Sequence, residues 1–306
     1  SSGDLHNGVL NINYNSGAPY LTYNVSYAYS RFRPQFIALA QGLSVHDAFD
    51  GYTNSRVDRR DDQVAVGVAY PFDRYHRMEL TAGVETERIR YKDFGVTAVG
   101  EYRTIKIAAV RDTANGRYLV PVEGSRLRAE YEKNVPALGG NQDFEIRRLE
   151  GHQFLPLGGQ KSLALRLLGQ NSVGPDARFF SLTGVPGGIR GYRRNSLDTV
   201  GRYMAQGTAE FRFPLIPNLD YDLALFFPDL YFKALYGAVF DDIGAAWDTR
   251  EQARHAALGR AQNAVGFGVR TYVFILQTFP LVVSIDVAKQ TTSKTWVSYL
   301  YVGQSF

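Results

Sequence analysis

The sequence predicts an all-β fold, a transmembrane antiparallel up-and-down β-barrel of a Gram-negative outer membrane. The first observation is composition: 20 tyrosines against two methionines, together with 30 glycines, suit strands and tight turns better than helices. The second is that apolar and polar residues alternate strictly along many segments. The third is that no uncharged apolar run approaches the roughly 18 residues that a membrane-spanning helix needs. Strands are therefore expected to cross the lipid.

The alternation places a continuous apolar stripe on one face of each candidate strand. In residues 21–30, three tyrosines, a leucine and a valine alternate with small residues, most of them polar, and in residues 77–87 the polar face carries Glu79 and Glu85. A soluble sandwich also alternates, because one face of each strand lies against a core. Two features favour the membrane instead. Tyrosines lie toward strand ends, as in an aromatic girdle, and short turns alternate with long polar loops.

The connections give the order and the number of the strands. Short connections are expected at the periplasmic end and long ones outside, and the two kinds follow one another along the chain. Residues 44–61 and 171–201 are predicted outer loops, whereas residues 214–231 are long where a short turn is due, so we expect a helix or a flap there. The pattern predicts fourteen strands, with twelve and sixteen as alternatives, and both termini in the periplasm. The predicted strands are residues 8–14, 20–30, 34–43, 62–71, 77–91, 102–112, 124–133, 143–154, 161–170, 202–213, 232–247, 262–274, 280–289 and 295–306.

One predicted outer loop is unusually rich in glycine. It reads Gly184-Val185-Pro186-Gly187-Gly188-Ile189-Arg190-Gly191-Tyr192. Glycines permit positive φ angles and close approach of the backbone to its surroundings. The composition therefore indicates a compact turn that is anchored to another part of the protein.

Two short motifs resemble those of a known family. Ile189-Arg190-Gly191-Tyr192, preceded by Gly188, resembles the Val-Arg-Gly-Phe/Tyr motif in loop six of the BamA and bacterial surface-antigen superfamily of outer-membrane assembly and secretion factors. Phe240-Asp241-Asp242-Ile243-Gly244 resembles the family's Phe-x-Asp-x-Gly motif. The resemblance implies that the motif loop folds into the lumen, where Asp242 holds Arg190 beside Phe240 and Gly244. Glu210 stands where the family has an inward-facing acidic residue.

The pairing of Arg190 with Asp242 also has a physical argument of its own. An arginine fork and a carboxylate inside a narrow lumen form a charge-assisted contact that fixes a loop to the wall. The alternative is that Arg190 lies in water in an external loop while Asp242 lines a wet lumen.

The resemblance extends from Gly8 to Phe306. At the end of the last strand, Val302 and Phe306 resemble the C-terminal signal by which barrels are delivered for insertion. A short first strand would close against the last strand through a seam with few ladder hydrogen bonds. The residues assigned to this seam are Leu10, Ile12, Tyr14 and Leu300.

The sequence departs from the family in two respects. Nine strands precede the motif loop where the usual sixteen-stranded member has eleven, so we expect a barrel two strands smaller with a tighter lumen. No periplasmic transport-associated domains precede the barrel in this chain. Residues 1–306 are therefore expected to form one barrel domain, the C-terminal part of a longer protein.

Composition and spacing argue against several other classes of protein. The chain has no cysteine, and a net charge of +4 arises from 34 basic and 30 acidic residues spread along it, so nucleic acid is not an expected partner. No cofactor, catalytic residue or metal ligand is predicted, and we expect no enzymatic activity. The histidines lack the spacing of a metal site; they are His6, His46, His76, His152 and His255.

Three functions are compatible with these observations. The first is insertion or translocation of proteins at the outer membrane, with unfolded outer-membrane proteins as clients. The second is a membrane anchor or export barrel for a fused upstream periplasmic or surface domain. The third is a passive porin, which a lumen filled by the motif loop disfavours. Outer-membrane lipid and lipopolysaccharide are expected partners in each case.

Overall fold

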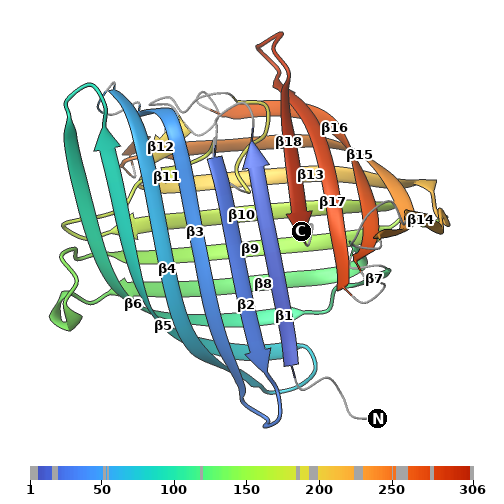
Figure 1. The fold of residues 1–306 in the computed structure, drawn as a ribbon, viewed down its shortest axis with the longest axis horizontal. Helices are drawn as coiled ribbons and strands as arrows, with labels where there is room; N and C mark the ends of the chain where they lie inside the picture. Colours follow the sequence, from blue (N-terminus) through green and yellow to red (C-terminus); the bar gives the residue numbers. More distant parts are fainter. Residues whose placement is uncertain are drawn as a thin grey trace.

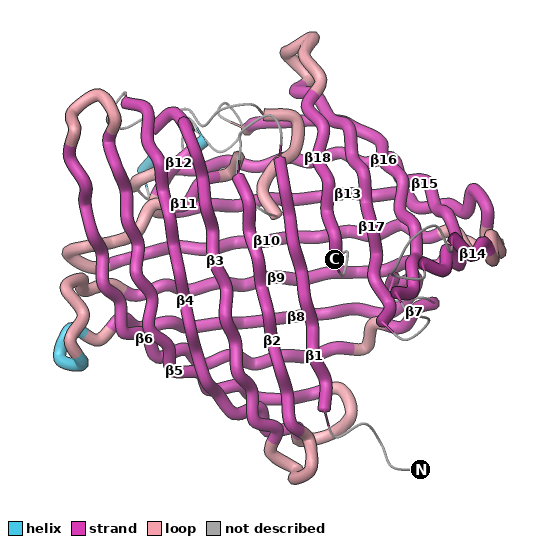
Figure 2. Tube along the Cα trace, in the orientation of Figure 1, coloured by secondary structure: helices cyan, strands magenta, loops and turns pink. Residues whose placement is uncertain are grey.

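The structure consists almost entirely of long antiparallel strands, with only short helical turns (Figure 2). It is a computed structural model. Among the described residues, no helix is long and apolar enough to span a membrane. The described residues are 6–15, 20–50, 53, 55–117, 120–183, 187–192, 199–223, 230–249, 251–252, 261–275 and 279–303.

Among the described residues, fourteen long strands form the wall, and four short strands and one 3-10 turn lie between them. The long strands are β1 (His6–Asn15), β2 (Tyr20–Tyr29), β3 (Gln35–Asp50), β4 (Ser55–Pro71), β5 (His76–Tyr91), β6 (Val96–Asp112), β8 (Val120–Asn134), β9 (Glu145–Pro156), β10 (Ser162–Val173), β13 (Tyr203–Ile216), β15 (Leu230–Trp247), β16 (Gln262–Ile275), β17 (Phe279–Gln290) and β18 (Val297–Gly303). The short elements are β7 (Asn115–Arg117), η1 (Pro136–Leu138), β11 (Phe180–Ser181), β12 (Val200–Gly201) and β14 (Tyr221–Leu223).

The long strands pair in chain order around a ring (Figure 1). Each long strand is antiparallel to the long strands before and after it, β13 pairs with β15, and β1 pairs with β18. The predicted number of fourteen is confirmed, with nine strands before the motif loop and five after it. Since the number is even, β1 begins and β18 ends at the same end of the barrel.

The two faces of the wall reverse the distribution found in a soluble protein, because the outer face is apolar and the inner face carries charged residues. Apolar side chains on the outer face are exposed, such as Val66 at 62% and Leu80 at 55%. Charged side chains on the inner face are buried, such as Glu85 on β5 and Arg270 on β16. Exposing this apolar surface to water would cost about 25 cal/mol of free energy per Å². The distribution fits a barrel that is surrounded by lipid and has a polar lumen.

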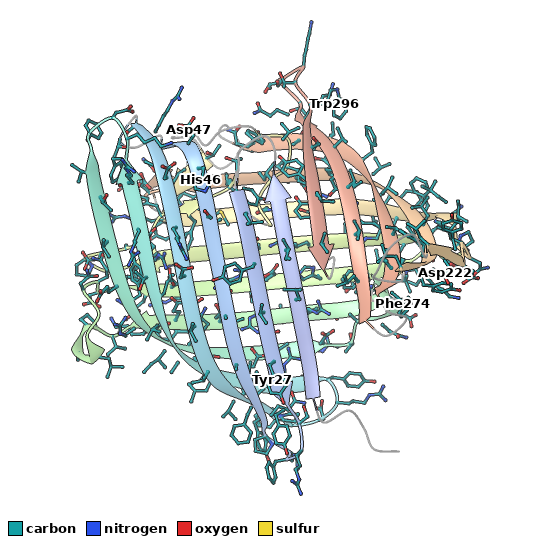
Figure 3. The ribbon with its side chains drawn as sticks, in the orientation of Figure 1. Tyr27, His46, Asp47, Asp222, Phe274 and Trp296 are labelled. Atoms are coloured by element: carbon teal, nitrogen blue, oxygen red, sulfur yellow. The ribbon has the colours of Figure 1, made fainter. Side chains whose placement is uncertain are left out.

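Exposed aromatic residues gather where β2–β5 reach their short turns. Tyr27 lies at this end of the barrel in Figure 3. Its exposed neighbours along the turns are Phe32, Phe36, Tyr70, Phe72 and Tyr75. Tyrosine and phenylalanine are enriched where lipid chains meet the polar interface, so the cluster marks one boundary of the apolar band.

Strands occupy parts of two predicted connections. Residues 44–61 form no long loop, because β3 and β4 continue to Asp50 and from Ser55. Their alternation is hidden where charged residues occupy the outer face as well, as at Arg60. No helix occurs in the described part of residues 214–231. Instead β13 continues to Ile216, and β14 pairs with the start of β15. Residues 224–229 lie outside the described residues.

Candidate functional site

The motif loop, residues 174–202, joins β10 to β13, and its described part from Gly187 to Tyr192 lies against the inner wall. Ile189, Arg190, Gly191 and Tyr192 are all buried, and Ile189 donates its N–H to the carbonyl of Leu182 at 2.6 Å. Gly187 and Gly191 have positive φ angles of 70° and 87°, a conformation that glycine adopts without strain. The expected anchored turn is present over Gly187 to Tyr192, and residues 184–186 lie outside the described residues.

Arg190 is bound by carboxylates from three different strands. It donates from Nε and Nη2 to the two oxygens of Asp242 on β15, at 2.8 and 2.9 Å. Its Nη1 donates to Asp286 on β17 at 2.8 Å and to Glu210 on β13 at 3.3 Å. The guanidinium also lies over the ring of Phe240, 3.3 Å from its centroid. The structure thus brings Arg190 together with Asp242, Glu210 and Phe240, and adds Asp286.

Two further arginines balance the charge of this cluster. Arg270 on β16 donates to Glu210 at 2.9 Å and also to Asp286, and Arg212 on β13 donates to Glu210 at 2.8 Å. Together with Arg190 and Asp242 these residues form what we call the lumen network, three guanidinium groups and three carboxylates that are all at least 95% buried. Each buried charge has an oppositely charged partner, the condition under which buried ions are tolerated.

Neither sequence motif includes Asp286, Arg270 or Arg212. Asp286 carried the one available signal, since it falls on the inner face of an alternating segment whose other face is leucine, valine and isoleucine. Its proximity to Arg190 depends on how β15, β16 and β17 align. That register is a long-range property which alternation within one strand does not determine.

Gly244 allows the motif loop to approach the wall. A Cβ atom at this position would lie 2.8 Å from the carbonyl oxygen of Ala205, 2.9 Å from Leu182 and 3.0 Å from the side chain of Ile189. Ile189 packs there in a small apolar cluster with Leu168, Leu182, Tyr192 and Met204. The glycine predicted beside the motif loop therefore lies directly under Ile189. Gly188, the remaining predicted residue of the loop, is half-buried.

Side chains of the wall also bind several other groups of the motif loop. Gly191 donates its N–H to the hydroxyl of Tyr299 on β18 at 2.7 Å, and Tyr192 donates its hydroxyl to Gln262 at 2.9 Å. The carbonyl of Gly187 accepts from Arg166 at 2.8 Å and from Gln206. The motif loop is consequently held by strands from β10 to β18.

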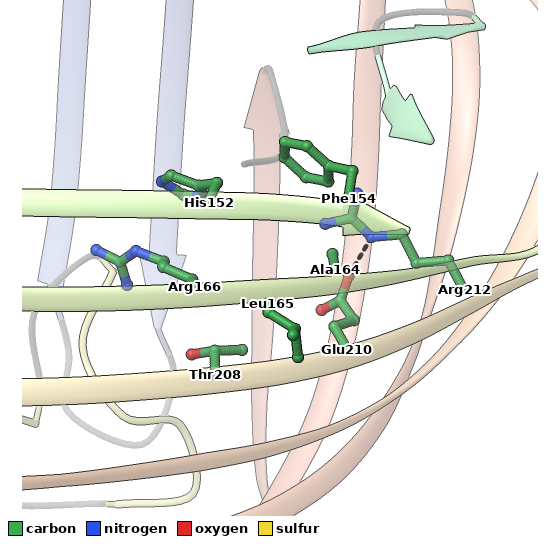
Figure 4. A pocket seen from close by; sticks show the side chains of 8 residues that line it. All are labelled: His152, Phe154, Ala164, Leu165, Arg166, Thr208, Glu210 and Arg212. Carbon is green, nitrogen blue, oxygen red and sulfur yellow. Dashed lines mark hydrogen bonds and ion pairs between the residues drawn. The ribbon is translucent and has the colours of Figure 1, made fainter. Parts of the chain in front are cut away.

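A small pocket adjoins the lumen network on the β9, β10 and β13 side (Figure 4). Glu210 and Arg212 form its polar corner, and their ion pair is the dashed contact in the figure. The remaining lining residues are His152, Phe154, Ala164, Leu165, Arg166 and Thr208. Because its acidic group is already bound by arginines, the pocket belongs to the network that holds the loop.

The predicted seam residues lie on the two strands that close the ring. Leu10, Ile12 and Leu300 are exposed on the outer face, and Tyr14 is in register with Leu300 across the β1–β18 pair. Val302 is in register with Ile12. Phe306, assigned to the C-terminal signal, lies outside the described residues.

The family of the chain follows from its sequence. The model of the Omp85 superfamily domain matches residues 7–306. The chain belongs to the Omp85 superfamily. Barrels of this superfamily are integral outer-membrane proteins, and the resemblance drawn from the two motifs is confirmed. Among curated proteins, none matches the sequence.

Solved structures share the fold of this Omp85 barrel at low sequence identity. The structure of BamA from Haemophilus ducreyi lacking POTRA domains 1–3 matches with a TM-score of 0.62 and 13% identity over 99% of this chain and 70% of that one. CdiB from Escherichia coli matches with a TM-score of 0.61 and 10% identity, and CdiB from Acinetobacter baumannii with 0.58 and 11%. Both CdiB matches cover 99% of this chain. The chain spans only 63% and 60% of the CdiB structures, less than two thirds of their length.

Removing the hydroxyl of Tyr299 tests one hydrogen bond of the site. Tyr299→Phe removes the acceptor of the buried Gly191 N–H, and an unsatisfied buried donor costs about 1–3 kcal/mol. We expect a lower urea midpoint for unfolding of the lipid-embedded barrel. Tyr70→Phe, a change at an exposed tyrosine on the outer face of β4, is the control and should unfold as the parent does. Equal midpoints for both variants would show that this hydrogen bond contributes nothing.

Proposed function

We propose that this Omp85 barrel inserts or translocates proteins at the outer membrane, and that clients engage it at the seam between β1 and β18. The observation that carries the proposal is the small number of described register pairs at that seam. Among the described residues, four register pairs join β1 to β18, from Ile12–Val302 to Asn15–Tyr299. The next smallest number between long neighbours is seven, between β17 and β18. Fewer ladder hydrogen bonds lower the free energy of local opening.

The position of the motif loop inside the lumen supports the same proposal. The lumen network binds the motif loop to β13, β15 and β17 through buried charge-assisted contacts. A loop bound inside the lumen narrows any aqueous channel there, so a passive porin is disfavoured. Opening the seam breaks backbone pairs at one place only.

The motif loop also contacts one side of the seam. Tyr299, which accepts from Gly191, is in register with Asn15 of β1. The loop therefore positions the strand that must separate from β1. We infer that this end of the barrel faces outward, and that the end where β1 begins and β18 ends, with its short turns, faces the periplasm.

A disulfide across the seam tests the proposal. Tyr14→Cys with Leu300→Cys joins two register-paired positions, and antiparallel partners lie about 4.5–5.5 Å apart between Cα atoms, within the range of a disulfide. The chain has no cysteine of its own, so no other disulfide can form. The assay measures folding of an unfolded outer-membrane protein into liposomes that contain the purified barrel. We expect acceleration over empty liposomes, its loss on oxidation, and its return on reduction.

The matched control places a disulfide between two strands that share many register pairs. Leu80→Cys with Ile107→Cys joins β5 to β6, where both side chains are exposed on the outer face. This cross-link should leave the acceleration unchanged. Full activity of the oxidised seam variant would contradict client entry at the seam. No acceleration by the parent barrel would favour an anchor or export barrel for a fused domain.

A further inference from the structure

A second arginine of the motif loop lies in a charged site on another part of the wall. Arg178 is five residues beyond the end of β10, and its Nη2 lies 2.8 Å from Glu85 and 3.8 Å from Glu87, both on β5. Its guanidinium lies over the rings of Tyr102 and Phe144, with 4.5 and 5.7 Å to the centroids. A cation between carboxylates and aromatic faces gains from both kinds of contact.

The chain around Arg178 is held in place before the side chain reaches β5. Asp176 and Asp143 exchange two hydrogen bonds, at 3.1 and 2.9 Å, and the N–H of Arg178 donates to Ser172 at 2.9 Å. Gly174 has a φ of 130°, and a Cβ atom there would lie 2.7 Å from the carbonyl oxygen of Asp143. The first part of the motif loop is thus packed on the connection between β8 and β9, which directs Arg178 toward β5.

The sites of Arg178 and Arg190 lie on nearly opposite sides of the ring. Around the barrel, β5 is six strand-to-strand steps from β15 in one direction and eight in the other. Arg178 binds β5, whereas Arg190 binds β13, β15 and β17. One loop therefore has a charged anchor on each of two facing walls.

We propose that Arg178 is a second anchor of the motif loop, and that the two anchors together hold the loop across the lumen as a fixed partition. A loop held by Arg190 alone could swing about one wall and open a path for ions. A loop held on both walls blocks the lumen only while both sets of contacts persist. Release of either anchor is expected to let ions pass, and this needs no client protein, so it is separate from transport at the seam.

The test is ion conductance of the purified barrel in planar lipid bilayers. Arg178→Gln removes the charge of the second anchor and leaves the lumen network intact. We expect a several-fold rise in mean conductance over the parent. Arg88→Gln is the matched control, because Arg88 is an exposed arginine on the outer face of β5 that has no ion pair with any described residue, and its conductance should equal that of the parent.

A second variant keeps the test informative if Arg178→Gln does not fold. Among the described residues, Arg178 is the ion-pair partner of Glu85, so Glu85→Gln weakens the same anchor without touching Arg59 or its contacts. A smaller rise in conductance is expected. Parent-like conductance in both variants, including the case where the unfolding temperature falls, would overturn the proposal, because Arg178 would then stabilise the wall without closing the lumen.

Discussion

Replacing Arg190 by glutamine is expected to cost the barrel about 3–5 kcal/mol, because loss of one partner leaves other buried charges uncompensated. Asp242 would lose a bidentate partner, and Asp286 and Glu210 would rely on Arg270 and Arg212 alone. The measurement is the urea midpoint of the lipid-embedded barrel, followed by its mobility on gels with and without heating. Arg88→Gln, which removes the same charge from the outer face, should change the midpoint little.

A charge exchange separates direct contact from general destabilisation. Arg190→Glu alone should be more harmful than Arg190→Gln, because a carboxylate would then face three others. Adding Asp242→Arg is expected to recover part of the loss and no more, since Asp286 and Glu210 still face position 190. If the two changes instead produced losses that simply add, direct pairing of the two residues would be contradicted.

Gly191→Ala is expected to have the second large effect, through the backbone. A residue other than glycine at a φ of 87° is strained by about 1–3 kcal/mol. The new Cβ atom would also lie 2.8 Å from the carbonyl carbon of Lys289 and 3.0 Å from the nitrogen of Gln290. Both are atoms of the β17 backbone, so they cannot move aside as a side chain would. We expect the loop to be displaced from the wall and the urea midpoint to fall by more than the strain alone explains.

Gly139 offers a control with the same backbone strain and no overlap. Its φ is 94°, and a Cβ atom there would meet nothing within 4 Å. The difference between Gly191→Ala and Gly139→Ala therefore measures the contact with β17. If the two variants lost the same stability, the close approach of Gly191 to β17 would carry no energetic weight.

The alternation predicted the wall well wherever one face meets lipid. Along β5 the exposed Leu80 and Val84 alternate with the inward Glu79 and Glu85, and lipid on one side keeps this contrast strong. The contrast disappears near the strand ends, where the outer face carries charged residues such as Arg60. The sequence therefore predicts loops where the strands in fact continue, since polar residues on both faces look the same in a strand and in a loop.

The candidate site was predictable to the extent that its residues lie in local motifs. Arg190 and Asp242 each belong to a short recognisable motif, whereas Arg178, Asp286 and Tyr299 stand in segments without one. These residues come together because closure of the barrel places β5, β17 and β18 around the motif loop. Contacts of that kind follow from strand register and barrel size, which no single segment encodes.

The order of the lumen network along the chain constrains how the protein matures. Arg190 precedes its three carboxylate partners by 20, 52 and 96 residues. The most distant, Asp286, lies on β17, the last strand but one. The motif loop thus cannot complete its contacts until β13, β15 and β17 have joined the wall, and bringing such distant residues together is entropically costly. Burial of Arg190 therefore marks the moment at which the C-terminal third of the chain has assembled around the loop.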